Sequence, residues 1–203
     1  MNDRSPDARE APATLFLARH GRTALNAAGL LRGRLDPPLD EVGLDEARRL
    51  AENLARVRVL SVVTSPLRRA VQTADAVARR IGVEPSVDVR LVDRDYGGCA
   101  GKTKQEVEAL WGAVDRAPGV EPLHKVRARA LEALLDIAAR AAGSSAVVVS
   151  HDVVIRTALV SFDPGLGDPE RLPQDTGCFN VVERRHGIWS VISVNERPPG
   201  DDL

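Results

Sequence analysis

Cysteine is scarce in this chain of 203 residues, and neither sign of charge is in excess. The two cysteines, Cys99 and Cys178, are isolated and form no CxxC pair, which argues against a zinc site and against a disulfide framework. The 28 basic and 29 acidic residues leave a formal net charge of -1. Because no field of one sign covers the molecule, we expect no general affinity for nucleic acid or for an anionic membrane.

Long hydrophobic runs are also missing. The longest stretch without Asp, Glu, Lys or Arg covers residues 141–151, well short of the ~20 apolar residues that a membrane span needs. The first ten residues are rich in charge, and no apolar run of secretory-signal length follows them. These absences predict a cytoplasmic protein without a membrane segment.

The composition is globular, with 43% hydrophobic and 28% charged residues, and the length suits one domain with a core of its own. Residues 1–13 are polar and contain two prolines, so we expect a flexible N-terminal arm. A single domain over residues 14–197 and a C-terminal tail over 198–203 complete the predicted organisation.

Short apolar runs alternate with helical patterns along the chain. Residues 14–18, 60–64 and 146–149 have the length and β-branching of buried strands. Helical patterns follow over 44–54, from Ser65 to Gly82, over 121–142 and after His151. In the second of these, Ser65 is placed as N-cap, Pro66 as first helical residue and Gly82 as the C-terminal stop. Residues 178–183 and 188–194 flank a turn and suggest a closing hairpin. This alternation predicts an α/β fold, a three-layer sandwich with a mainly parallel sheet flanked by helices.

Histidines and arginines follow the predicted strands. Arg19-His20-Gly21, residues 65–69 and Ser150-His151-Asp152 come directly after the three apolar runs. Ligands of parallel sheets bind at the carboxyl ends of the strands. Imidazole and guanidinium groups gathered at that edge suit a phosphate.

Three sequence blocks resemble the histidine phosphatase superfamily, in its phosphoglycerate mutase-like branch. They are LARHGRTALN (residues 17–26), SPLRRAVQTA (65–74) and VVSHDVVIR (148–156), in the order of the family. The resemblance implies a phosphoglycerate mutase-like fold and a phosphohistidine formed on His20. It also implies phosphate binding by Arg19, Arg69, His151 and Asn26, without a metal or another cofactor.

Two local ambiguities accompany this assignment. Arg185-His186-Gly187 repeats the first tripeptide inside a charged turn, so we interpret that copy as structural. Helical spacing does not choose between Arg68 and Arg69, and only the block of the family favours Arg69.

The leaving group also needs a proton donor. Residues 91–97, LVDRDYG, resemble the family segment that carries the acid, which places aspartate at Asp93 where glutamate is usual. Asp152, directly after the second histidine, is the alternative acid, as in a distant branch of the superfamily. The segment 32–36, including Gly33, and residues 104–122 are expected to contact the substrate.

The sequence thus predicts a phosphatase: a metal-independent phosphomonoester hydrolase that acts on a small phosphorylated molecule. A cofactor-dependent phosphoglycerate mutase is the first alternative, although only 49 residues separate Gly101 from His151, fewer than such mutases usually have there. The second alternative is a catalytically weakened protein that binds a phosphorylated ligand. The sequence leaves open whether the chain forms a homodimer.

Overall fold

The computed structural model describes residues 11–197, and in this range it contains one mixed sheet of six strands. The strands are β1 (Ala13–Arg19), β2 (Ser61–Thr64), β3 (Pro85–Val87), β4 (Ser145–Ser150), β5 (Phe179–Arg185) and β6 (Ile188–Glu196). Their order is β3-β2-β4-β1-β5-β6; the first four are parallel to one another, and β5 is antiparallel to both of its neighbours. The sheet is therefore mainly parallel, as predicted. Residues 1–10 of the expected arm and the expected tail 198–203 lie outside the described residues.

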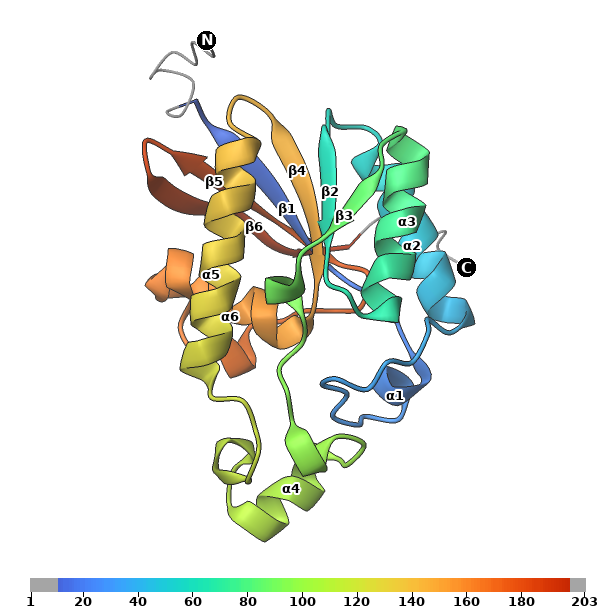
Figure 1. Cartoon of the computed structure of the whole chain (residues 1–203), viewed down its shortest axis with the longest axis vertical. Coiled ribbons are helices and arrows are strands. Elements are labelled where there is room, and N and C mark those ends of the chain that lie inside the picture. Colours follow the sequence, from blue (N-terminus) through green and yellow to red (C-terminus); the bar gives the residue numbers. More distant parts are fainter. Residues whose placement is uncertain (1–10, 198–203) are drawn as a thin grey trace.

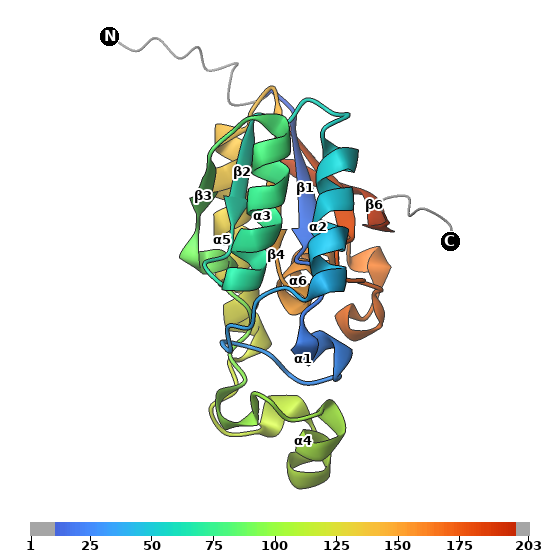
Figure 2. The ribbon, with the colours of Figure 1, turned by 90° about the vertical axis from the view of Figure 1, so that its right-hand side faces the viewer.

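Helices cover both faces of this sheet (Figure 1). They are α1 (Ala24–Ala27), α2 (Glu41–Leu54), α3 (Arg68–Ile81), α4 (Lys104–Trp111), α5 (Leu123–Arg140) and α6 (Asp152–Phe162). Helices α2 and α3 pack on one face and α5 and α6 on the other, which Figure 2 shows from the side of α3. The predicted three-layer sandwich is confirmed.

Side chains that point alternately to the two faces of the sheet form two hydrophobic cores. In β1, Leu15 and Leu17 belong to the hydrophobic cluster with α5 and α6, whereas Phe16 and Ala18 belong to the cluster with α2 and α3. Successive strand side chains point to opposite faces. A run that is apolar at every position is therefore what a strand between two helical layers requires.

The start of α3 differs from the prediction. The helix begins at Arg68, with Leu67 as the N-cap residue, so Pro66 precedes it and Ser65 does not cap it. The hydroxyl of Ser65 accepts from the N–H of Leu67 at 3.3 Å, ahead of the helix, and lies 2.7 Å from Nε2 of His151. The predicted end is confirmed, because Gly82 adopts a left-handed conformation with φ 76°.

The helix expected behind Gly43 also begins earlier, at Glu41. Asp40 is its N-cap, and its carboxylate accepts a hydrogen bond from the backbone N–H of Gly43 at 2.8 Å. Gly43 is buried within this first turn, where a Cβ would lie 2.0 Å from the carbonyl oxygen of Arg22. The loop after β1 can therefore rest directly on the backbone of α2.

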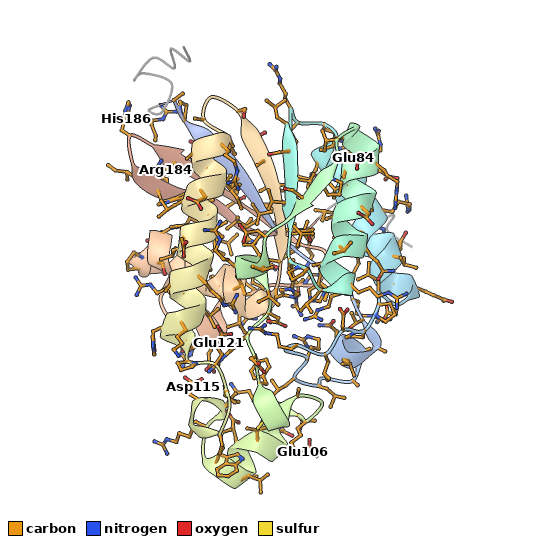
Figure 3. All side chains as sticks on the ribbon, in the orientation of Figure 1. Glu84, Glu106, Asp115, Glu121, Arg184 and His186 are labelled. Carbon is orange, nitrogen blue, oxygen red and sulfur yellow. The ribbon has the colours of Figure 1, made fainter. Side chains whose placement is uncertain are left out.

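The predicted hairpin forms between β5 and β6. Arg185 pairs with Ile188, and the two residues between them, His186 and Gly187, both have positive φ, as the tight hairpin turns of antiparallel strands favour. Figure 3 shows His186 at the end of the molecule opposite to Glu106. This second copy of the tripeptide thus lies far from the predicted site.

A small cap lies beyond the carboxyl ends of the central strands (Figures 1 and 2). It contains α4 and has a minor core of its own, built on Tyr96, Cys99, Val107 and Ala117. No helix within residues 11–197 is both long and apolar enough to cross a membrane. In the same range no three His, Cys, Asp or Glu side chains are grouped to hold a metal ion.

Candidate active site

The two motif histidines lie side by side because their strands are neighbours. The pairing of β1 with β4 continues past the strand ends, where the N–H of His20 donates to the carbonyl of Ser150 at 3.1 Å. On the other side of β4, the N–H of Ser65 donates to the carbonyl of Val149 at 3.0 Å. The rings of His20 and His151 are 5.1 Å apart between centroids, and both residues are buried. The structure thus brings the three sequence blocks together at one edge.

The hydrogen bonds of the His20 ring show which of its two nitrogens carries the proton. Its Nδ1 lies 2.7 Å from the carbonyl oxygen of Gly21, and its Nε2 lies 3.2 Å from the Nε–H of Arg69. A carbonyl can only accept and a guanidinium can only donate, so this network assigns the proton to Nδ1 and a lone pair to Nε2. Burial, with Arg69 and Arg19 nearby, lowers the pKa of His20 well below its ordinary value. The ring is therefore neutral near pH 7, with a lone pair on Nε2.

Glycine at position 21 lets this loop pack closely. A Cβ there would lie 2.3 Å from the carbonyl oxygen of Gly43, far inside van der Waals contact. The N–H of Gly21 donates to Oγ1 of Thr73 at 3.1 Å. The residue after His20 is thus tied to α2 and α3 together.

Arg69 is the fully buried centre of the site. Its guanidinium donates to Oδ2 of Asp93 at 2.9 Å, to the carbonyl of Gly33 at 3.0 Å and to that of Leu35 at 2.8 Å, besides its contact with His20. Such a fork holds the group in one orientation. The neighbouring Arg68 is exposed. Tertiary packing therefore selects Arg69 from the adjacent pair.

Arg19 directly precedes His20 in the sequence and is also buried. Its Nη1 donates to the carbonyl of Gln174 and lies 3.7 Å from Oδ2 of Asp152. The other carboxylate oxygen of Asp152 lies 2.5 Å from Nε of Arg156. The carboxylate of Asp152 is thus shared between two guanidinium groups, one of which belongs to the first sequence block.

His151 is the N-cap residue of α6. Its Nε2 lies 2.7 Å from the hydroxyl of Ser65, and its Nδ1 lies 3.8 Å from Oδ2 of Asp93. Burial, then Arg69 and His20, lower its pKa well below the ordinary value. Among the described residues this buried Nδ1 has no hydrogen-bond partner.

The carboxyl group of Asp93 lies close to His151 and Arg69. Burial raises its pKa above the ordinary aspartate value, although Arg69 and Arg32 act in the opposite direction. Its Oδ1 accepts from the N–H of Arg94 at 2.9 Å. The guanidinium of Arg129 donates to the carbonyl oxygen of Asp93 at 3.2 Å, to that of Arg90 at 2.7 Å and to that of Val92, and so holds this segment of backbone in place.

The remaining predicted residues have different surroundings. The amide oxygen of Asn26 accepts from the N–H and the hydroxyl of Thr23, at 3.1 and 2.7 Å, and closes a capping box on α1. The carbonyl of Gly33 braces Arg69, and its φ of 49° and its close contacts with Tyr96 exclude a side chain there. These bonds show a structural role for both residues. Their contact with a phosphate stays a prediction.

Three further residues belong to the site, and sequence reasoning did not assign them there. Ser65 orients His151, and Arg129 holds the segment of Asp93. Arg32 is half-buried and acts electrostatically on His20, His151 and Asp93. Its own pKa is lowered, mainly by burial. The only signal for Arg32 was its place beside Gly33, in a segment expected to contact the substrate.

Known proteins resemble this chain over almost its whole length. A family model described as histidine phosphatase superfamily (branch 1) matches residues 15–197. Phosphoserine phosphatase 1 of Hydrogenobacter thermophilus is 32% identical, over 90% of this chain and 87% of the relative. A solved phosphoglycerate mutase of Bacillus anthracis superposes with a TM-score of 0.84 at 21% identity, over 94% of this chain and 96% of that one. The last match confirms the predicted phosphoglycerate mutase-like fold.

A longer relative matches as well. The bifunctional protein Rv2228c of Mycobacterium tuberculosis is 33% identical over 93% of this chain, but the match covers 55% of that protein. The chain thus spans about half the length of the first curated relatives it matches. Both the family model and the buried pair of histidines at the strand ends lead to one assignment. The chain belongs to the histidine phosphatase superfamily, branch 1.

Proposed function

We propose that the chain is a metal-independent phosphomonoester hydrolase that acts through a phosphohistidine at His20 on a small phosphorylated molecule. The observation that supports this most directly is the state of His20. Its ring is buried and neutral, with the Nε2 lone pair directed at the guanidinium of Arg69. A nucleophile beside a fixed cation is what attack on a phosphate requires.

The reaction has two displacements. In the first, the lone pair on Nε2 of His20 forms a bond to phosphorus, and the bond from phosphorus to the alcohol oxygen breaks. Arg69 then donates to phosphoryl oxygens in place of its present bond to His20, and Arg19 and Arg32 add positive charge around them. In the second, water attacks phosphorus and breaks the N–P bond, which returns His20 to its neutral form.

Asp93 is the proposed proton donor to the leaving oxygen. Burial raises the pKa of Asp93 and so favours the protonated acid, and its Oδ2 lies 3.8 Å from Nδ1 of His151 and 2.9 Å from Nη2 of Arg69. Asp93 would give its proton to the alcohol and recover one from the attacking water. Asp152, the alternative acid, lies within ion-pair distance of Arg19 and Arg156. That arrangement suits a residue that positions the phosphate-binding arginine.

Hydrolysis is favoured over mutase activity by the short middle segment. Only 49 residues separate Gly101 from His151, and much of that length forms α4 and α5. A relative named phosphoserine phosphatase 1 matches over most of its length, which supports the hydrolase. A catalytically weakened binding protein is disfavoured because His20, His151 and both arginines lie in one buried cluster.

The test is a covalent trap. We expect hydrolysis of 4-nitrophenyl phosphate in excess chelator, and acid-labile phosphate on the protein after quenching with labelled substrate. His20→Ala should abolish both signals, while His124→Ala, an exposed position on α5, should keep them. Transfer of phosphate between the hydroxyls of phosphoglycerate instead of its release would show a mutase. Full activity in His20→Ala would refute the proposal.

A further inference from the structure

A cleft lies between the cap and α6, and the proposed chemistry has not used it. Its volume is about 240 Å³. Apolar side chains from five separate segments line it: Leu31, Tyr96, Val114, Leu123 and Val153. Residues 168–170, after α6, form its remaining wall. Both sides of the cleft thus supply apolar surface, which an organic group entering it would cover.

The cleft adjoins the phosphate site along two walls. Val153 directly follows Asp152, which pairs with Arg19. On the other wall Tyr96 lies against Gly33, where an added Cβ would be 3.0 Å from the Tyr96 ring, and the carbonyl of Gly33 holds Arg69. A phosphate bound by the two arginines would therefore lie next to this cleft.

The cationic side chains that line the cleft already have acidic or carbonyl partners. Lys104 lies 2.7 Å from a carboxylate oxygen of Glu170, an ion pair that joins the cap to the body across the cleft. Arg94 lies 2.6 Å from Asp115. Figure 3 shows Asp115 and Glu121 near the lower end of α5, next to the cap.

Arg156 completes this set of neutralised cations. It pairs with Asp152 at 2.5 Å and donates to the carbonyl of Glu170 at 2.9 Å. Arg32, by contrast, acts on His20 and Asp93 and belongs to the phosphate site. A carboxylate inside the cleft would have to displace an existing partner, whereas an apolar group would not. The cost of desolvating a charge without a free partner would then disfavour acidic substrates.

We propose that this cleft binds the alcohol part of the substrate and selects phosphomonoesters of uncharged, apolar alcohols over those that carry a carboxylate. The proposal rests on the hydrolase activity proposed above and specifies its substrate class. Discrimination would come from the walls of the cleft, since the arginines and histidines of the phosphate site contact the phosphoryl group that all such esters share.

A series of linear alkyl phosphates from ethyl to hexyl tests the apolar wall, because the basicity of the leaving alcohol hardly changes along it. In the wild type, kcat/KM should rise about threefold to fourfold per methylene until the cleft is filled, the factor expected for burying a CH₂ group. Leu123→Asn and Val114→Asn should flatten the series. Leu110→Asn, on the exposed side of α4 at 67% exposure, is the matched control and should keep the slope.

A second comparison tests the charge argument. Butyl phosphate should exceed its carboxylate analogue, 4-phosphooxybutanoate, at least tenfold in kcat/KM. Equal or better turnover of the analogue, lost in Lys104→Ala, would show instead that the lysine leaves Glu170 to bind substrate carboxylates, and would overturn the proposal. A flat alkyl series with normal, His20-dependent hydrolysis would also overturn it while leaving the hydrolase intact. Turnover of no ester at all would refute the hydrolase itself.

Discussion

Replacement of Arg69 by lysine is the sharpest test of the site, because the adjacent Arg68 provides its own control. Arg69 is fully buried and reaches His20, Asp93 and two backbone carbonyls through different nitrogens of one planar group. Arg68 is exposed, and the hydrogen bond from its backbone N–H to Oδ1 of Asp36, at 2.6 Å, does not involve the side chain. Lysine retains the positive charge at either position but not the fork.

The magnitude follows from the lost donors. A lysine ammonium cannot span His20 and Asp93 while also bonding the carbonyls of Gly33 and Leu35, so at least one donor to the transferring phosphoryl group is lost. Loss of one such charged donor costs about 3 kcal/mol of transition-state stabilisation, or about a hundredfold in rate. Arg68→Lys should change the rate less than about twofold.

The assay measures kcat/KM for 4-nitrophenyl phosphate in excess chelator, and urea unfolding of each variant is measured in parallel. Lysine is preferred to alanine, since alanine would leave the buried carboxyl of Asp93 and the carbonyls of Gly33 and Leu35 without their donor, at a cost of about 1–3 kcal/mol of stability for each such group. A folded Arg69→Lys variant within threefold of wild type would refute the argument. So would equal losses in the two variants.

Three other outcomes follow from the geometry. Asp93→Asn should lower turnover of alkyl phosphates about a hundredfold and spare 4-nitrophenyl phosphate, whose leaving group needs no proton. The same selectivity in Asp152→Asn would show that Asp152 is the acid. The His20 ring should stay neutral in nitrogen NMR at pH 6, where a free histidine is mostly protonated. Because the unfolded state then binds one more proton than the folded state, His20 should lower the free energy of unfolding as the pH falls below about 6.5. A ring that is protonated at pH 6 would contradict the effect of its burial. Gly21→Ala should cost about 1–3 kcal/mol in urea unfolding, because its Cβ would meet a backbone carbonyl, whereas Gly98→Ala, with open space at its Cβ, should cost almost nothing.

Local sequence determined the elements of this fold and the order of its motifs. Apolar runs that fit a strand between two helical layers placed β1, β2 and β4, and Gly82 ended α3 because it accepts a left-handed conformation. The rule that parallel strands bind ligands at their carboxyl ends then brought His20 and His151 to one edge, where the structure has them 5.1 Å apart. Each of these properties depends on neighbouring residues or on a general rule of topology.

Tertiary structure alone decided the roles that depend on contacts between distant segments. Ser65 has the position of a helix cap in the sequence, but its hydroxyl bonds His151, which is 86 residues away. Arg69 differs from Arg68 only because the loop of Gly33 and the carboxylate of Asp93 close around it. The raised pKa of Asp93 likewise comes from burial, a property of the packed chain. A hydrogen-bond partner or a desolvated charge is defined by what surrounds the group in space, and local patterns of sequence carry no such information.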